Sequence, residues 1–363
     1  MIVVAKIGTS SVTDPAGGVD RAAIAKLCSE AAHVRGRGHH VVLVTSGAIT
    51  AGVTALELSA RPRDAVTLQA LSAVGQSRLM GVYDEALSRH GLVGGQVLLS
   101  PLDFFDRSQY LHARGTLLRL LELGVVPIIN ENDAVADDAI RFGDNDLISA
   151  LVAHLISADL LVLLTDQPGL LTADPRIDAS ASLIEEIVLI DAALEAVAGG
   201  AGSVRGSGGM ASKLAAAKMA AWSGVRTTIA AARRERVLVD AVAGQPGVGT
   251  VVLPHERKLT AKKLWIAFAA PAAGSVVVDA GARRALLERG ASLLPAGVVE
   301  VRGRFAPGDA VEVLDPTGEV FAKGLVALDA GSLAAVLGRR TAALPNGAPH
   351  EVIHRDDLVL VPG

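Results

Sequence analysis

Two kinds of hydrophobic pattern alternate along the first 250 residues. Short runs rich in valine, isoleucine and leucine are separated by longer stretches in which apolar residues recur at helical spacing. The short runs are apolar at successive positions, which is typical of strands covered by helices on both faces. We therefore predict strands at 2–7, 41–45, 96–99, 126–130, 160–165 and 227–231, and helices at 21–34, 65–89, 108–123, 144–156 and 211–223. This order predicts an α/β fold with an open, mainly parallel sheet sandwiched by helices.

The pattern changes near residue 250. The charged stretch after Pro254 is interpreted as a linker that leads into a strand at 264–267. After about Pro271, short valine-rich runs with frequent glycine and proline predict strands at 275–279, 298–303, 310–314, 320–326 and 358–361. We therefore expect an α/β domain at 1–253, a linker at 254–270 and a small β-barrel-like domain at 271–363.

Composition narrows the class of protein. The chain has 363 residues, enough to bury a core in two domains without disulfides, and its formal net charge of −4 gives no overall attraction to nucleic acid or anionic membrane. The single cysteine, Cys28, sits among apolar residues at helical spacing, so we expect an inert core thiol. The first residues lack the pattern of a signal peptide, and charged or polar residues interrupt the most apolar stretch. These features predict a cytoplasmic protein without a membrane span.

Candidate chemistry gathers where the predicted strands end, which is where open α/β sheets bind ligands. The first strand leads into Lys6-Ile7-Gly8-Thr9-Ser10. A lysine in an apolar strand is costly unless it is paired or serves a site, so an anion cradle is favoured over a turn with an exposed lysine. The second strand leads into Ser46, which is either a functional residue or an ordinary helix cap.

Carboxylate and amide groups crowd the end of the fourth strand. Asn130-Glu131-Asn132-Asp133 is followed closely by Gly143-Asp144-Asn145-Asp146. Asp144 is a natural N-cap and Asp146 a favourable first-turn acid, yet one helix needs only one cap. The remaining carboxylate and amide side chains favour recognition of an ammonium group, of a metal ion, or of a lysine that must be held in place.

A glycine-rich segment opens the alanine-rich helix at 211–223. It reads Gly206-Ser207-Gly208-Gly209-Met210-Ala211-Ser212-Lys213 and lacks the glycine before lysine of a Walker A loop. Lys213 in the first turn opposes the helix dipole by about 0.3–1 kcal/mol unless an anion binds there. This favours phosphate binding over a plain linker. By contrast, His350 and His354 fall in a predicted strand and loop, which weighs against a zinc site.

Two lysines, glycine turns and a carboxylate cluster without an evident general base suit phosphoryl transfer to a nucleophile that is already ionised. A carboxylate acceptor fits this description. Residue patterns alone do not identify that acceptor.

The motifs occur together in a recognisable order. They are 6–10, 45–49, Ala73-Val74-Gly75-Gln76, 130–135, 143–146, Leu163-Leu164-Thr165-Asp166, Thr172-Ala173-Asp174-Pro175-Arg176 and Gly208-Gly209-Met210 with Lys213. In this order they resemble the glutamate 5-kinase family, which belongs to the amino-acid kinases. The resemblance continues into 288–295 and 354–357, which look like that family's carboxyl-terminal PUA domain, so it covers nearly the whole chain.

The resemblance implies ATP-dependent phosphorylation of the γ-carboxylate of L-glutamate, the first step of proline biosynthesis, with feedback inhibition by proline. It implies that Lys6 and Lys213 neutralise the phosphoryl group in transfer while Asp146 holds both lysines. The substrate-binding residues that it implies are Ser46, Asp133, Asp144 and Asn145. The implied nucleotide-binding residues are Lys6, Gly8, Thr165, Asp166, Ser207, Gly208, Gly209, Met210, Ala211, Ser212 and Lys213. Mg²⁺ would bridge ATP phosphate oxygens, and no protein ligand for a metal is expected.

The remaining expectations concern partners and alternatives. We expect a homo-oligomer, functional coupling to glutamyl-phosphate reductase, and no membrane partner. The alternatives are an amino-acid kinase for aspartate, N-acetylglutamate or a nucleoside monophosphate, or a PUA-type RNA-binding protein. RNA binding is disfavoured because 271–363 holds nine basic and eleven acidic residues, a net charge of −2.

Overall fold

The computed structural model describes residues 1–14, 17–104, 106–135, 145–173, 178, 180–199, 209–256, 258–270, 272–339 and 350–361. The chain divides into two compact units, Met1–Lys258 and Leu259–Gly363.

The first unit is built on an eight-stranded sheet with the order β3-β4-β2-β1-β5-β7-β8-β6. Its strands are β1 (Ile2–Ile7), β2 (His40–Val44), β3 (Gly94–Leu99), β4 (Val126–Glu131), β5 (Leu160–Thr165), β6 (Glu186–Ile187), β7 (Arg226–Ala231) and β8 (Thr250–Val252). All neighbours pair in parallel except β7 and β8. The predicted open, mainly parallel sheet is confirmed.

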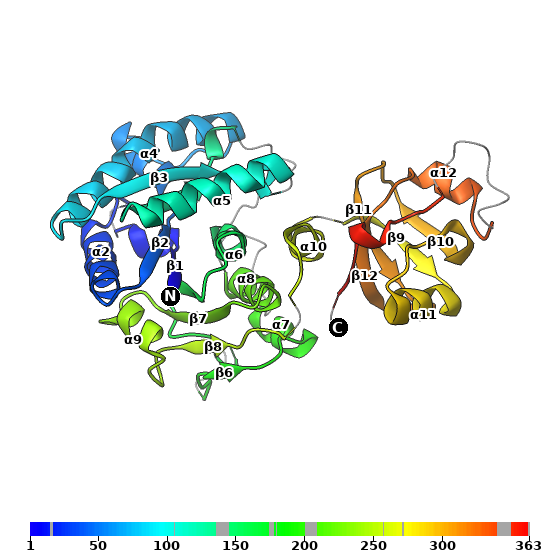
Figure 1. Ribbon diagram of the computed structural model, residues 1–363. Coiled ribbons are helices and arrows are strands. Elements are labelled where there is room, and N and C mark those ends of the chain that lie inside the picture. The colour runs from blue at the N-terminus through cyan, green and yellow to red at the C-terminus, as the bar shows by residue number, and fades with distance from the viewer. Residues whose placement is uncertain are drawn as a thin grey trace. The chain divides into compact units, whose positions relative to one another are not determined.

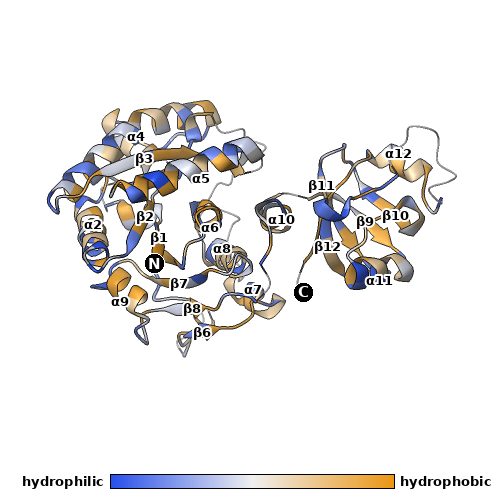
Figure 2. Cartoon of the chain, in the orientation of Figure 1, coloured by the Kyte–Doolittle hydropathy of each residue, from blue (hydrophilic) through white to orange (hydrophobic). Residues whose placement is uncertain are grey.

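Helices cover both faces of this sheet (Figure 1). One face carries α2 (Arg21–Gly36), α4 (Ala65–Ser88) and α9 (Val237–Ala243), and the short helices α1 (Thr9–Val12) and α3 (Ala48–Ala55) pack on α2 and α4. The other carries α5 (Arg107–Glu122), α6 (Asn145–Leu155) and α8 (Met210–Trp222), with α7 (Ala192–Ala198) against α8. The inner strand β1 and helix α6 are strongly hydrophobic (Figure 2).

The two faces of β1 have different neighbours because successive side chains of a strand point to opposite sides. Val3, Ala5 and Ile7 join the core formed with α2, α4 and α9. Lys6 therefore points to the other face, where α6 and α8 lie. The prediction of burial on both faces fails for β3, which is half-exposed because it forms the edge of the sheet.

The second unit holds a five-stranded sheet with the order β10-β9-β11-β12-β13. Its strands are β9 (Ala272–Val278), β10 (Val298–Gly303), β11 (Ala310–Leu314), β12 (Val320–Leu325) and β13 (Leu358–Leu360), and α11 (Ala280–Arg289) and α12 (Ala330–Ala335) join them. The predicted strand at 264–267 is wrong. This segment forms α10 (Ala261–Leu264) and a turn of π-helix (Trp265–Ala269), in which Leu264 and Ile266 are fully buried.

The prediction for the single cysteine is confirmed. Cys28 lies on α2 and is fully buried. Burial raises the pKa of its thiol to about 12, so the thiol stays protonated at neutral pH.

Candidate active site

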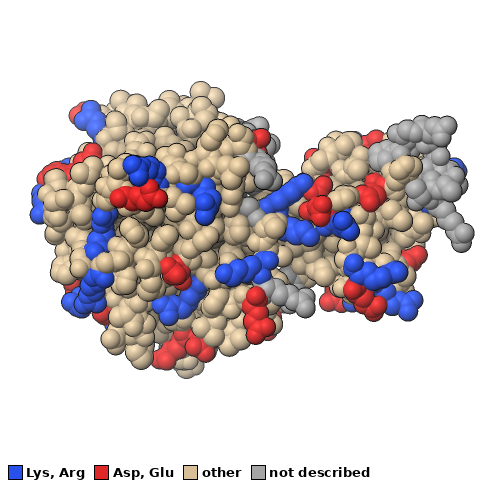
Figure 3. Space-filling model, viewed as in Figure 1, with Lys and Arg blue, Asp and Glu red and all other residues tan. Residues whose placement is uncertain are grey.

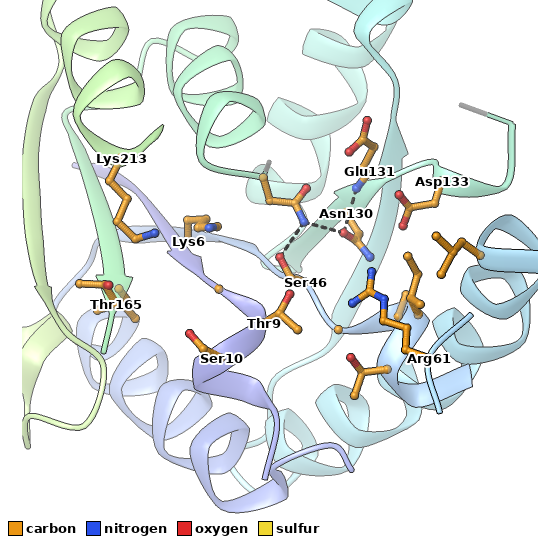
Figure 4. Close-up of a pocket in the computed structure, with 18 residues that line it drawn as sticks. Lys6, Thr9, Ser10, Ser46, Arg61, Asn130, Glu131, Asp133, Thr165 and Lys213 are labelled. Atoms are coloured by element: carbon orange, nitrogen blue, oxygen red, sulfur yellow. Dashed lines mark hydrogen bonds between the residues drawn. The ribbon is translucent and has the colours of Figure 1, made fainter. Parts of the chain in front are cut away.

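A cavity of about 310 Å³ lies where the central strands end. The chain leaves β1, β2, β4 and β5 at the same edge of the sheet, because these strands are parallel. Residues at or just after the ends of all four strands line the cavity (Figure 4). This is the position at which open α/β sheets bind ligands.

Two lysines share one carboxylate at one side of this cavity. Lys6 Nζ lies 2.5 Å from Asp146 Oδ1, and Lys213 Nζ lies 3.1 Å from Asp146 Oδ2. All three side chains are buried, with exposed fractions of 2% for Lys6, 0% for Asp146 and 3% for Lys213. Each comes from a different element, namely β1, α6 and α8, so the tertiary fold alone brings them together.

The electrostatics of this group keep the carboxylate of Asp146 ionised. Burial disfavours the ionised form of Asp146 and is the largest influence on it, but the two lysines together outweigh burial and lower its pKa. An ionised carboxylate that accepts from two ammonium groups is a poor proton acceptor. Asp146 therefore suits a role in holding the lysines better than a role as a general base.

The start of α8 adds a further contact to Asp146. The N-cap of this helix is Gly209, which has no side chain with which to cap it. The hydroxyl of Ser212 lies 3.0 Å from Asp146 Oδ2 and 2.8 Å from the Gly209 carbonyl oxygen. The sequence indicated that Lys213, in the first turn, needs an anion nearby, and the structure supplies one in the form of Asp146.

A network of amides forms the floor of the cavity. The Nδ2 group of Asn145 lies 2.8 Å from both the Thr45 carbonyl oxygen and Ser46 Oγ, and 3.0 Å from Asn130 Oδ1. Asn130 Oδ1 also accepts from the backbone amide of Glu131. These contacts tie the ends of β2 and β4 to the start of α6 and orient the Ser46 hydroxyl beside the cavity (Figure 4).

Helix α4 supports this floor from the other face of the sheet with three polar groups that the sequence reasoning missed. Ser72 Oγ donates to Asp133 Oδ2 at 2.9 Å, Asn130 Nδ2 donates to Gln76 Oε1 at 2.9 Å, and Tyr83 Oη donates to Thr45 Oγ1 at 2.8 Å. Each fixes a group at the cavity or next to it. Polar residues on the buried face of a helix were the available signal.

Helices α3 and α4 approach so closely that only glycine fits between them. A Cβ added to Gly75 would lie 1.8 Å from the Ala48 carbonyl oxygen, and one added to Gly52 would lie 2.0 Å from the Leu71 carbonyl oxygen. Gly47, which starts α3, has a φ of 104°, a conformation that favours glycine. This packing sets the path of the Ser46–Ala48 turn along the cavity.

The structure places the remaining sequence-predicted residues as follows. Gly8 and Thr165 line the cavity, and a Cβ on Gly8 would lie 3.6 Å from Lys6 Nζ. Asp166 is exposed and accepts from the Thr165 hydroxyl at 3.0 Å. Gly209, Met210 and Ala211 form the start of α8 outside the lining of this cavity. Three predicted residues, Asp144, Ser207 and Gly208, lie outside the described part of the chain.

Two further charged residues line the cavity. The sequence indicated Glu131 only as a member of the carboxylate and amide cluster, and it did not single out Arg61. Glu131 ends β4 and is almost fully buried. Arg61 lies in the segment between α3 and α4 and is exposed. Its sequence neighbourhood is an ordinary polar loop, which gave no signal of a site.

Comparisons with known proteins agree on the family. The amino acid kinase family model matches residues 1–231, and the PUA domain model matches 274–347. A glutamate 5-kinase of Cupriavidus metallidurans is 47% identical over 363 residues, covering 99% of this chain and 97% of that protein. A glutamate 5-kinase of Burkholderia mallei has the same identity and coverage.

Among solved structures, a carbamate kinase from Giardia lamblia bound to AMP-PNP superposes with a TM-score of 0.50 at 19% identity, covering 70% of this chain and 98% of that one. This likeness supports the fold. Within the described part of the chain, no helix has the length and hydrophobicity needed to cross a membrane.

Proposed function

The chain belongs to the amino-acid kinase family, and on that premise we propose that it transfers the γ-phosphoryl group of ATP to the γ-carboxylate of L-glutamate. The product would be L-glutamyl 5-phosphate, which is the first intermediate of proline biosynthesis. The full-length likeness to glutamate 5-kinases supports this choice of acceptor over the other substrates of the family.

The site suits this reaction because its acceptor needs no deprotonation. A γ-carboxylate is ionised at neutral pH, so one of its oxygens attacks the γ-phosphorus directly while the bond to the bridging oxygen of ADP breaks. Lys6 and Lys213 would balance the negative charge of the phosphoryl group in transfer. Asp146 positions both ammonium groups before ATP arrives, which removes the cost of ordering them during the reaction.

The other side of the cavity suits the amino-acid part of the substrate. Asp133, held by Ser72, offers a carboxylate to the substrate ammonium group. Ser46 lies between Asp133 and the two lysines (Figure 4), and the Nδ2 group of Asn145 donates to its hydroxyl oxygen. Both side chains would contact the carboxylate that reacts. Thr165, Asp166 and the start of α8 would contact the nucleotide. As the resemblance implies, Asp144 would bind the substrate, and Ser207 and Gly208 would bind the nucleotide.

Magnesium is proposed to enter with ATP. Among the described residues, no group of three histidine, cysteine, aspartate or glutamate side chains could hold a metal ion. Mg²⁺ usually keeps several waters and binds phosphate oxygens with few protein carboxylates, which fits this residue set. When bound, the ion would neutralise phosphate charge.

Family membership also supports three proposals about regulation and partners. Proline would inhibit by competing with glutamate, the protein would form a homo-oligomer, and its labile product would be passed to glutamyl-phosphate reductase. RNA binding receives no support from the second unit, where basic and acidic side chains are interspersed on the visible face (Figure 3).

The observation that carries the proposal is the buried Lys6–Asp146–Lys213 group beside the amides of Asn130 and Asn145. The test is ADP release from ATP and Mg²⁺ with L-glutamate, L-aspartate, N-acetyl-L-glutamate and UMP as separate acceptors. We expect release with L-glutamate well above that with the others. Faster ADP release with another acceptor than with L-glutamate, or ADP release that none of the four acceptors increases, would contradict the assignment.

A further inference from the structure

We propose that Arg61 binds the α-carboxylate of the amino-acid substrate and thereby excludes carboxylic acids that lack this second carboxylate. The inference rests on the proposed function, because it assigns a subsite for the same substrate.

The first observation is where Arg61 lies. It belongs to the segment between α3 and α4 and lines the same cavity as the reacting groups. In Figure 4, its guanidinium points into the cavity toward Asn130, on the side of Ser46 away from Lys6 and Lys213. The cavity therefore has cationic groups at both of its ends.

The second observation concerns which cations are already engaged. Lys6 and Lys213 both contact Asp146 and stand where phosphoryl transfer would occur. Within the described residues, no carboxylate lies within ion-pair distance of Arg61. Among the described cations that line this cavity, Arg61 is thus the one that does not contact Asp146 and can bind a second carboxylate.

The shape of the substrate requires its two recognition groups to lie close together. The ammonium and α-carboxylate groups of an amino acid are attached to one carbon, so the groups that recognise them must be neighbours. Asp133 and Arg61 line the same end of the cavity, and they have opposite charges. One binds the ammonium and the other the α-carboxylate, while the side-chain carboxylate extends toward the lysines.

Arginine suits this task for a physical reason. Its planar guanidinium donates two parallel hydrogen bonds to a carboxylate, which fixes orientation as well as charge. A substrate held at its α-carbon by Asp133 and Arg61 can turn only its γ-carboxylate to the phosphoryl group. The same contact excludes monocarboxylates, because they leave the guanidinium without a partner.

The test compares substrates that differ in one group. The Arg61→Ala variant and the unchanged protein are assayed by ADP release with L-glutamate, with glutamate whose α-carboxylate is converted to an amide, and with glutarate, which lacks the ammonium group. In Arg61→Ala, kcat/KM for L-glutamate should fall roughly tenfold or more, as expected for loss of hydrogen bonds to a charged group. The kcat/KM for the α-amide should change little. The ratio of kcat/KM for L-glutamate to kcat/KM for the α-amide should therefore fall roughly tenfold or more.

Two control variants and two further measurements distinguish loss of the α-carboxylate contact from a general loss of activity. Arg63→Ala removes a nearby exposed arginine outside the cavity lining and should leave all the kinetics unchanged. Arg61→Lys should recover part of the loss. The KM for ATP should stay the same in all variants, and discrimination against glutarate should persist because Asp133 remains.

The outcomes separate this inference from the function on which it rests. If the unchanged protein fails to phosphorylate L-glutamate, the proposed function is wrong. If it does so, but Arg61→Ala lowers turnover of L-glutamate and of its α-amide equally, or lowers neither, the assignment of Arg61 is overturned while the function stands.

Discussion

Replacing Asp146 by asparagine tests how the site holds its two lysines. The substitution preserves size and shape but removes the charge that both ammonium groups share at 2.5 and 3.1 Å. The amide oxygen of the introduced asparagine can accept a hydrogen bond from one lysine, yet a neutral amide cannot balance two buried cations. The lysines would repel each other and move toward solvent.

The expected magnitude follows from the burial of all three groups. Removing one partner of a buried ion pair costs about 3–5 kcal/mol in unfolding free energy, because it leaves uncompensated buried charge. The rate effect is separate. Misplacing a group that stabilises transition-state charge costs about 10²–10³ in kcat. We therefore expect Asp146→Asn to be less stable and severely slowed, with a smaller change in the KM for glutamate.

The assay has a stability arm and a kinetic arm. Urea unfolding gives the free-energy difference between the two proteins, and steady-state ADP release gives kcat. Because the lysines lower the pKa of Asp146 in the folded state, its stabilisation is present above the ordinary value of 3.8 and is lost as pH falls below it. The difference in unfolding free energy should therefore be full at pH 7 and shrink in acid.

Asp240 provides a matched control. It also pairs with two cations, with Arg234 at 3.2 Å and Arg236 at 3.7 Å, but it is partly exposed. Asp240→Asn should cost less than about 1 kcal/mol and leave kcat unchanged. A kcat for Asp146→Asn close to that of the unchanged protein, or equal stability losses in both variants, would refute the reasoning.

Three further perturbations test the supports of the site. Gly75→Ala should lower the unfolding free energy, measured by urea titration, by about 1–3 kcal/mol and raise the KM for glutamate, because the added Cβ would clash with the α3 backbone. The control is Gly81→Ala, on an exposed face of the same helix, which should leave the unfolding free energy unchanged or raise it. Tyr83→Phe should lower the unfolding free energy by about 1 kcal/mol through the lost bond to Thr45, and an unchanged urea midpoint would contradict that. Cys28 should react with a thiol reagent at pH 8 only after unfolding, so rapid labelling of the native protein would show that burial does not protect it.

Much of the first unit could be predicted because its strands are covered on both faces. Continuous apolar runs such as 160–165, separated by stretches of helical periodicity, are typical of such strands, so the sheet and its ligand-binding edge follow from the sequence. Lys6 stood out for the same reason, since a lysine in such a run is costly without a partner. The identity of that partner depended on the tertiary fold, which brings Asp146 from α6 and Lys213 from α8 to the same point.

Other features of the fold and the site could not be predicted from the local sequence pattern. The apolar run at 264–267 was predicted to be a strand because short apolar segments look alike in strands and buried helices, and here it forms a helix. Ser72 and Gln76 stand four residues apart on the buried face of α4, but their partners, Asp133 and Asn130, follow some 54–61 residues later. Arg61 gave no signal, because an exposed loop arginine gains a role only from the cavity that it lines.

The position of the transferred phosphate tests the central claim most directly. The protein is incubated with ATP, Mg²⁺ and L-glutamate in the presence of hydroxylamine, which converts an acyl phosphate to a stable hydroxamate. Mass spectrometry then locates the hydroxamate on the α- or the γ-carboxyl group. The account predicts γ-glutamyl hydroxamate in an amount equal to the ADP released, with none formed by Lys213→Ala. An α-hydroxamate, or ADP release without any hydroxamate, would contradict it.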